Sequence, residues 1–229
     1  MVKFGSFPTM TPMNFEQARF NMVEQQIRTW EVLDQRVLDL LLRVRREEYV
    51  PPQYRTLAFA DMEIPLGHGE KMLAPKMEAR MLQELALRPS DKILEVGTGS
   101  GYMTALLASL GSHVYSVDIV TDFVQAAGLK LSANGIANVT LETGDAARGW
   151  DRHGPYDAIV LTGSVPVLAD TFTKSLLPGG RLIAVVGEPP VMEAQLITCV
   201  SAGACRTTEL FETCIASLKN APQPEKFVF

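Results

Sequence analysis

Hydrophobic residues follow a helical rhythm in the first part of the chain and a mixed strand-and-helix rhythm after it. One apolar stripe has the spacing i, i+3, i+4 and i+7 of an amphipathic helix. Its members are Val37, Leu40, Leu41 and Val44. Asn14 can cap this helix, with Gln17 as the partner of a capping box. We expect helix over about 14–46, a structured loop at 64–75 and a second helix at 76–87.

From residue 92 onward, short apolar runs alternate with helical patterns. The expected strands are 92–96, 113–117, 139–143, 157–161 and 181–186, and the expected helices are 102–110, 122–134 and 167–177. Such alternation favours βαβ units, so the pattern predicts an α/β fold with a doubly wound, mostly parallel sheet. After Pro190 the helices stop, and we expect 195–200 and 206–217 to form an antiparallel strand pair at the end of the sheet.

Composition narrows the class of protein. The chain has 229 residues, 47% of them hydrophobic, and a formal net charge of −5 with both signs mixed along the sequence. No block of like charges indicates a nucleic-acid surface, and no apolar run has the length of a membrane span. The first residues do not resemble a signal peptide. We therefore expect a cytoplasmic protein that binds neither nucleic acid nor membrane.

We expect a single domain at 13–229, preceded by a flexible tail at 1–12. Within the domain, 13–90 should form a helical and loop region, 91–187 a cofactor-binding core and 188–229 the C-terminal strands. The three cysteines, Cys199, Cys205 and Cys214, lack the spacing of a zinc site. We expect them to be free thiols, and we expect no metal.

The stretch ILEVGTGSGY, residues 93–102, predicts a strand, a glycine-rich turn and the start of a helix. Glycines in such a turn let a ligand approach the backbone, because no Cβ intrudes. A P-loop would need Lys followed by Ser or Thr after the glycines, and this pair is missing. A dinucleotide fingerprint, GxGxxG, fits Gly97 and Gly99, but Gly101 comes one place early and Tyr102 stands where glycine is needed. Hydride transfer stays as a weaker alternative.

The pattern ExGxGxG at 95–101 resembles motif I of the class I S-adenosylmethionine (SAM)-dependent methyltransferases. SAM carries an ammonium and a sulfonium group, which suit the charge of Glu95. Asp118 ends the second strand and could accept hydrogen bonds from both ribose hydroxyls. The resemblance implies that Asp145, after the third strand, meets the adenine amino group. With SAM as cofactor, the expected binding residues are Glu95, Gly97, Thr98, Gly99, Ser100, Gly101, Tyr102, Asp118, Ile119, Gly144, Asp145 and Ala146.

Six stretches resemble the protein-L-isoaspartate O-methyltransferases. They are MVEQQIR (22–28), REEYVPPQYRTLAFAD (46–61), PLGHGEKMLAP (65–75), ILEVGTGSGYMTALLA (93–108), YDAIVLTGSVP (156–166) and LLPGGRLIAVVG (176–187). The resemblance implies a Rossmann-like methyltransferase fold. It also implies an enzyme of protein repair, which methylates the carboxylate of isoaspartyl residues in damaged proteins or peptides. A carboxylate is ionised at pH 7, so neither a general base nor a metal would be required.

The residues expected to contact the methyl acceptor differ from those of that family. The family loop after GHG carries an active-site serine, and Leu73, which cannot donate a hydrogen bond, stands in its place. Lys71 replaces a threonine and could pair with the acceptor carboxylate, and His68 could order the loop or act as an acid or base. The groove-forming FVPL of the family is replaced by IASL at 215–218. A methyltransferase for another acceptor and a catalytically silent SAM-binding protein therefore stay open, and no oligomeric state is predicted.

Overall fold

The computed structural model describes residues 13–201 and 204–224. The tail expected at 1–12 and the last residues, 225–229, lie outside this part of the chain. None of the helices described is both long and apolar enough to cross a membrane.

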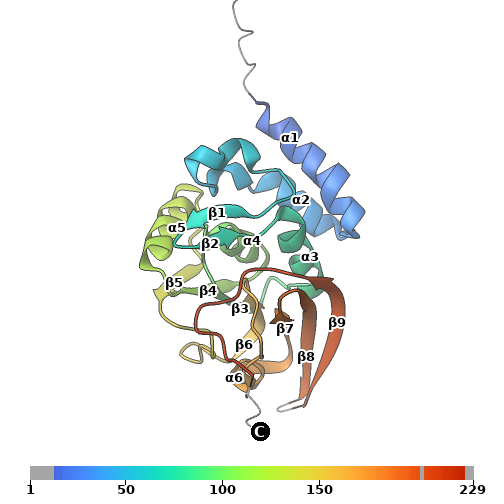
Figure 1. Ribbon diagram of the computed structural model, residues 1–229, viewed down its shortest axis with the longest axis vertical. Helices are drawn as coiled ribbons and strands as arrows, with labels where there is room; N and C mark the ends of the chain where they lie inside the picture. The colour runs from blue at the N-terminus through green and yellow to red at the C-terminus, as the bar shows by residue number, and fades with distance from the viewer. Residues whose placement is uncertain (1–12, 202–203, 225–229) are drawn as a thin grey trace, which may run out of the picture.

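One seven-stranded sheet forms the centre of the protein (Figure 1), in the order β5-β4-β3-β6-β7-β8-β9. The strands are β3 (Lys92–Val96), β4 (His113–Asp118), β5 (Val139–Thr143), β6 (Tyr156–Leu161), β7 (Leu176–Glu188), β8 (Val191–Ser201) and β9 (Ala204–Thr213). Strands β3 to β7 run parallel, while β8 and β9 are antiparallel additions. The predicted α/β fold, with its mostly parallel sheet and terminal antiparallel pair, is confirmed.

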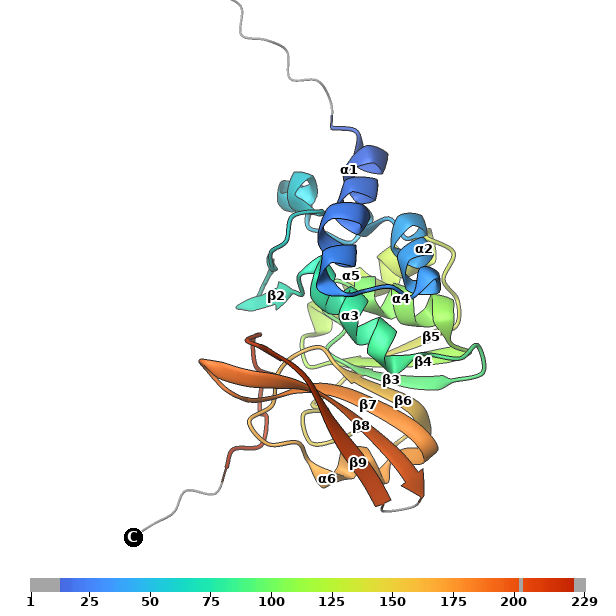
Figure 2. The same cartoon turned by 90° about the vertical axis from the view of Figure 1, so that its right-hand side faces the viewer.

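Helices cover both faces of the sheet (Figure 2). They are α1 (Phe15–Met22), η1 (Val23–Ile27), η2 (Arg28–Trp30), α2 (Gln35–Arg43), η3 (Arg46–Glu48), η4 (Pro52–Leu57), α3 (Pro75–Leu85), α4 (Tyr102–Leu110), α5 (Thr121–Ala133) and α6 (Asp170–Lys174). Helices α3, α4 and α5 lie on one face and α6 on the other. Because side chains alternate along a strand, Ile93 joins the hydrophobic layer of Leu106 in α4, and Leu94 joins that of Phe172 in α6.

The first predicted helix is broken into pieces. Asn14 caps α1 as expected, and its side chain accepts a hydrogen bond from the Gln17 amide at 3.1 Å. The Gln17 side chain bonds to Asn21 instead of closing the capping box. Glu31 has a left-handed φ of 59°, and Asp34 then caps α2. The prediction of one continuous helix over 14–46 is therefore wrong, although most of its apolar stripe is buried in α2.

Two further elements differ from the sequence prediction. The loop expected at 64–75 contains a small antiparallel hairpin, β1 (Ile64–Gly67) and β2 (Glu70–Met72). The helix expected at 167–177 is only the short α6, because strand β7 already begins at Leu176. The Pro-Gly-Gly run at 178–180, between the expected helix at 167–177 and the expected strand at 181–186, lies within β7.

Cys199 and Cys205 form a disulfide between β8 and β9. They are direct partners in the register of this strand pair, which the spacing of cysteines in the sequence does not reveal. The expectation of free thiols is therefore wrong for this pair, whereas Cys214 is free and exposed. No cluster of potential metal ligands occurs within 13–201 and 204–224.

Candidate active site

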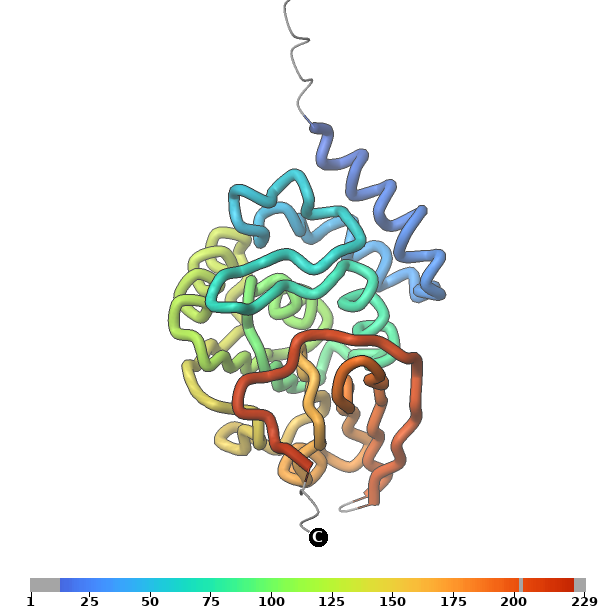
Figure 3. The backbone as a smooth tube through the Cα atoms, viewed as in Figure 1, coloured from blue at the N-terminus to red at the C-terminus, as the bar shows by residue number. Residues whose placement is uncertain are grey.

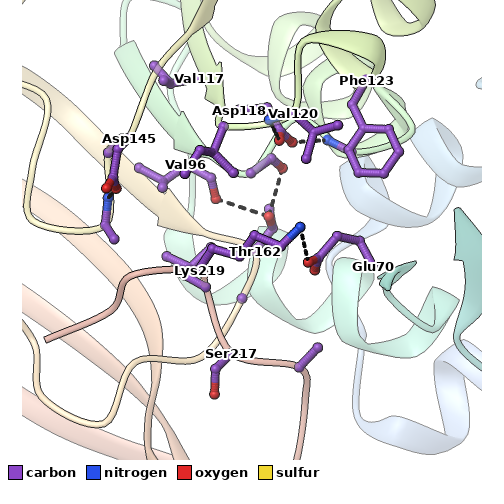
Figure 4. Close-up of a pocket in the computed structure, with 18 of the residues that line it drawn as sticks. Glu70, Val96, Val117, Asp118, Val120, Phe123, Asp145, Thr162, Ser217 and Lys219 are labelled. Atoms are coloured by element: carbon purple, nitrogen blue, oxygen red, sulfur yellow. Dashed lines mark hydrogen bonds and ion pairs between the residues drawn. The ribbon is translucent and has the colours of Figure 1, made fainter. Parts of the chain in front are cut away.

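A pocket of about 660 Å³ opens at the carboxyl ends of the parallel strands (Figure 4). Residues that follow β3, β4, β5 and β6 line it, and the β1–β2 hairpin and the segment after β9 complete its wall. The pocket lies where the order of strands reverses, between β3 and β6. Open α/β sheets bind their ligands at this point.

The glycine turn forms one side of the pocket. Gly97 has φ +99°, and a Cβ at this residue would lie 2.2 Å from Thr162 Oγ1. The Thr162 hydroxyl donates a hydrogen bond to the Gly97 carbonyl oxygen at 2.7 Å. Gly99 has φ +49°, and its N–H donates to Asp118 Oδ2 at 2.8 Å. The turn is therefore held from both neighbouring strands and leaves no room for a side chain at Gly97.

Asp118 ends β4 and lines the pocket, with its carboxylate beside Val120 (Figure 4). Its Oδ2 accepts a hydrogen bond from Gly99 N–H at 2.8 Å, and its Oδ1 accepts one from Val120 N–H at 2.9 Å. Burial raises the pKa of Asp118, and these two N–H donors oppose that shift. Each carboxylate oxygen has a further lone pair. Asp118 can therefore still accept hydrogen bonds from the hydroxyl groups of a ligand.

Asp145 follows β5 and lines the pocket together with Gly144 and Ala146. One of its carboxylate oxygens accepts a hydrogen bond from the Ala147 amide at 3.1 Å, and the other accepts one from the Asn220 side chain at 2.9 Å. Apolar wall residues complete this part of the pocket: Val96, Val117, Ile119, Val120 and Phe123. Such a combination of apolar walls and a few fixed polar groups is typical of small-molecule sites.

Glu95 lies beneath the turn and is not among the residues that line the pocket. It is fully buried. Its Oε2 accepts hydrogen bonds from Thr104 Oγ1 at 2.5 Å and from Ser116 Oγ at 2.6 Å. The Ser116 hydroxyl lies 2.6 Å from that of Thr98. The sequence suggested direct contact between Glu95 and the ligand, but the structure connects it to the turn through hydroxyl groups.

Glu95 should make the stability of the protein depend on pH. Burial raises the pKa of Glu95 from 4.5 to about 8, against the opposing effect of the Ser116 and Thr104 hydroxyls. Between about pH 4.5 and 8, Glu95 therefore stays protonated in the folded protein, whereas the unfolded chain releases this proton. Because the folded state binds the extra proton, its free energy of unfolding falls as pH rises through that window. We expect Glu95→Gln to flatten the fall in unfolding free energy by up to about 1 kcal/mol per pH unit. Denaturant unfolding across this window measures the effect, and parallel curves for both proteins would contradict it.

The other residues of the turn face away from the main pocket. Thr98 and Ser100 line an adjoining recess of about 310 Å³. Gly101 has φ +82°, and a Cβ there would lie 2.9 Å from that of Ala127. Tyr102 is fully buried, and its ring centroid lies 4.9 Å from the guanidinium carbon of Arg46. These residues shape and support the turn.

The loop that contains Leu73 borders both cavities. Leu73 is 6% exposed and lines the recess. Lys71 lines both the pocket and the recess, and its ammonium nitrogen lies 3.0 Å from a Glu63 carboxylate oxygen. His68 Nε2 lies 2.9 Å from Asp122 Oδ2 at the start of α5. His68 does not belong to the lining of either cavity, so its contact is one that orders the hairpin.

A buried ion pair fixes this loop from below. Arg46 pairs with Glu78, and its remaining donors bind the Leu73 carbonyl oxygen at 2.6 Å and the Ala58 carbonyl oxygen at 2.8 Å. Both charged side chains are buried. Burial raises the pKa of Glu78, and the neighbouring Arg46 opposes that shift. Arg46 thereby connects the N-terminal region to the backbone of the loop beside the pocket.

Two parts of the lining were not among the expected SAM-binding residues. Thr162 follows β6 and lines both cavities. Its position directly after a buried strand, parallel to the glycine strand, could have revealed it. Residues 216–219 also line the pocket, although they are distant in sequence from the turn. The hydrophobic periodicity does not indicate that the chain returns to the pocket after β9, and only the resemblance of 215–218 to a groove-forming segment pointed to this region.

The residues present fit SAM. Gly97 lines the pocket, and a Cβ at this residue would clash with Thr162, so the turn meets the pocket as bare backbone that a ligand can approach closely. Asp118 and Asp145 supply acceptors for hydroxyl and amino groups. The apolar wall beside them suits an adenine ring. We therefore treat Asp118, Asp145 and the glycine turn as the candidate SAM site.

Comparisons with known proteins show which family the chain resembles. A family model described as Protein-L-isoaspartate(D-aspartate) O-methyltransferase matches residues 17–214. The chain is 37% identical over 190 residues to a protein-L-isoaspartate O-methyltransferase of Aeropyrum pernix, with 81% of this chain and 72% of the relative covered. It is 42% identical over 158 residues to one of Anaeromyxobacter dehalogenans, with 69% and 76% covered.

A solved structure shares the fold. The structure is of a Plasmodium falciparum protein described as a protein-L-isoaspartate O-methyltransferase, in complex with S-adenosyl-L-homocysteine. The TM-score is 0.74 at 23% sequence identity, with 90% of this chain and 99% of that chain covered. At this identity the likeness shows the fold alone. The family model and the curated relatives go further, and they show that the chain belongs to the protein-L-isoaspartate(D-aspartate) O-methyltransferase family.

Proposed function

We propose that the protein is a SAM-dependent O-methyltransferase that methylates the carboxylate of isoaspartyl residues in damaged proteins or peptides. One observation carries the proposal. In a chain of this family, Asp118, Asp145 and the glycine turn line a single pocket at the strand ends. Curated relatives of the chain are named for the same activity.

Within this proposal, Asp118 holds the ribose hydroxyls and Asp145 the adenine amino group. The backbone of Gly97 and Gly99 lies against the methionine portion of SAM. Further contacts come from Ile119, Gly144 and Ala146, which line the same pocket. Glu95, Thr98, Ser100, Gly101 and Tyr102 act indirectly, by fixing the shape of the turn.

The reaction depends on alignment more than on acid–base groups. SAM supplies a methyl group on a sulfonium, which is a good leaving group. An oxygen of the acceptor carboxylate forms a bond to the methyl carbon while the carbon–sulfur bond breaks, and that electron pair stays on sulfur. The negative and positive charges cancel, and no proton is transferred. The task of the protein is to hold the two reactants in line, which can provide a large part of the rate enhancement.

Methyl transfer from labelled SAM to an isoaspartyl peptide tests the proposal. The matched control is the same peptide with a normal aspartyl residue, which should accept no label. Transfer to phenol or amine acceptors alone would indicate a different methyltransferase. Binding of SAM without transfer to any of these acceptors would indicate a catalytically silent SAM-binding protein.

Restoring a hydroxyl at position 73 should raise the activity. Leu73 lines the recess next to the pocket, so a serine there could donate a hydrogen bond near the reacting groups. One such donor near a transition state is worth up to about 100-fold, and we expect Leu73→Ser to increase kcat by about 10-fold or more. Leu73→Ala creates a similar cavity without the hydroxyl and is the control. Equal kcat values for the two variants would contradict this role of position 73.

We also propose the partner, the domain organisation and the location of the enzyme. Its partner is a peptide or protein that carries the acceptor carboxylate. Residues 13–229 act as one methyltransferase domain. The proposed location is the cytoplasm, because the charged cofactor does not cross membranes unaided and is consumed where the cell supplies it. Fractionation of cells that produce the protein tests this last point.

A further inference from the structure

The pocket presents an electrostatic problem for an anionic acceptor. Asp118, Asp145 and Glu70 all line it. Under the proposed function, on which this inference rests, a carboxylate must approach these three acids and is repelled by them. The loop around Leu73 offers it no hydroxyl donor at that residue. A positive side chain that reaches into the pocket would resolve the problem.

Two lysines line the pocket, Lys71 and Lys219. The Lys71 ammonium is turned to Glu63, which lines neither cavity. Lys219 instead extends across the pocket toward the β1–β2 hairpin (Figure 4). Its Nζ lies 3.0 Å from Glu70 Oε1 and donates a hydrogen bond to the His68 carbonyl oxygen at 3.2 Å. Lys219 is therefore the lysine whose charge the structure places at the pocket.

The segment that carries Lys219 is firmly attached. Its backbone pairs with Ser164, because Ser164 N–H donates to the Ala216 carbonyl oxygen and Leu218 N–H donates to the Ser164 carbonyl oxygen, both at 2.9 Å. Beyond the lysine, the Asn220 side chain donates to Asp145 at 2.9 Å. The tube in Figure 3 shows the chain after β9 returning past the β1–β2 hairpin. Lys219 thus projects from a fixed base, which limits the entropy lost when it binds a ligand.

The lysine also has a donor to spare. An ammonium group carries three N–H donors, and Glu70 and the His68 carbonyl oxygen take two of them. We propose that Lys219 binds the acceptor carboxylate and supplies the hydrogen-bond donor that Leu73 cannot provide. Lys219 is then a specificity-determining residue for carboxylate acceptors, and the charged partner Glu70 holds it in position between turnovers.

A purely structural role is the rival explanation. Lys219 connects the C-terminal segment to the hairpin, and this connection by itself could keep the pocket in shape. The two roles differ in what Glu70→Gln does. That change removes the ion pair but keeps the ammonium, so it damages a structural connection and leaves an acceptor-binding lysine in place.

The experiment measures binding of an isoaspartyl peptide to the protein saturated with S-adenosylhomocysteine (SAH), by calorimetry. We expect Lys219→Met to weaken peptide binding by about 10- to 100-fold, the loss of one charge-assisted hydrogen bond. The affinity for SAH should stay within about threefold. Glu70→Gln should bind the peptide at least as tightly as the wild type, and Lys219→Arg should recover part of the loss. Lys174→Met, which removes an exposed positive charge on α6, is the matched control.

Each of the following outcomes would overturn the inference. Equal peptide affinity for Lys219→Met and the wild type would remove Lys219 from the acceptor site. An equal loss in Lys219→Met and Glu70→Gln would assign the lysine a structural role. A larger loss in Lys71→Met would transfer the proposed role to Lys71. If the wild-type protein binds no isoaspartyl peptide in the presence of SAH and transfers no methyl group from SAM to such a peptide, the proposed function itself fails, and the assignment of Lys219 fails with it.

Discussion

Replacing Asp118 with alanine should weaken the binding of SAH by about 100-fold or more. Asp118 is expected to accept hydrogen bonds from the ribose hydroxyls, and such bonds to a charged group are worth about 1.5–3 kcal/mol each. The same carboxylate accepts the Gly99 N–H at 2.8 Å and the Val120 N–H at 2.9 Å. Its removal therefore also loosens the glycine turn and the entry to α5. Calorimetric titration of the folded variant with SAH measures the loss.

The control for Asp118 is a nearby acid outside the pocket. Asp122 lies at the start of α5, and its side chain is 72% exposed. We expect Asp122→Asn to bind SAH within about threefold of the wild type, because exposed pairs contribute little. Asp118→Asn keeps the volume and one acceptor oxygen, so it should fall between the wild type and Asp118→Ala. An affinity of Asp118→Ala within tenfold of the wild type, in a folded protein, would remove Asp118 from the proposed SAM site.

Replacing Arg46 with methionine should lower the free energy of unfolding by about 3–5 kcal/mol, the usual effect of breaking a buried ion pair. Arg46 is completely buried against Glu78 and also binds the carbonyl oxygens of Leu73 and Ala58. The change leaves the Glu78 carboxyl without its cation and two backbone acceptors without a donor. Chemical denaturation at one pH, with the wild type in parallel, measures the change.

The neighbouring arginine is the matched control. Arg45 is paired with Glu48 at the surface, and its side chain is 62% exposed. We expect Arg45→Met to change the unfolding free energy by less than about 1 kcal/mol. Adding Glu78→Leu to Arg46→Met should restore part of the stability, because the double change removes both charges. Equal destabilisation by Arg45→Met and Arg46→Met would contradict the structural role of the buried pair.

The central sheet could be predicted because the local sequence pattern and the packing of the folded sheet favour the same strands and turns. The strand at 92–96 carries three apolar residues, Ile93, Leu94 and Val96, and the glycine turn that follows it permits a close approach to the backbone. The positions of Asp118 and Asp145 could be predicted for the same reason, since Asp118 ends one strand of the parallel sheet and Asp145 lies just after the next. The helix at 14–46 was overestimated. The break at Glu31 depends on a left-handed backbone conformation, which the identity of this residue does not predict.

The residues proposed to bind the methyl acceptor could not be predicted in the same detail as the SAM site. The contribution of Lys219 depends on a return of the chain after β9, which no periodicity encodes. Glu95 was expected to face the ligand because the sequence shows its place on the strand but not the face to which it points. The structure turns it toward the Thr104 and Ser116 hydroxyls. The disulfide of Cys199 and Cys205 likewise depends on strand register.

The most direct test of the account is calorimetric titration of the wild-type protein with SAH and, in parallel, with NAD. The glycine turn, Asp118 and Asp145 are assigned to a sulfonium cofactor and its thioether product. The account predicts that one SAH binds per chain and that NAD does not bind. Binding of NAD, or the absence of binding by SAH to the folded protein, would contradict it.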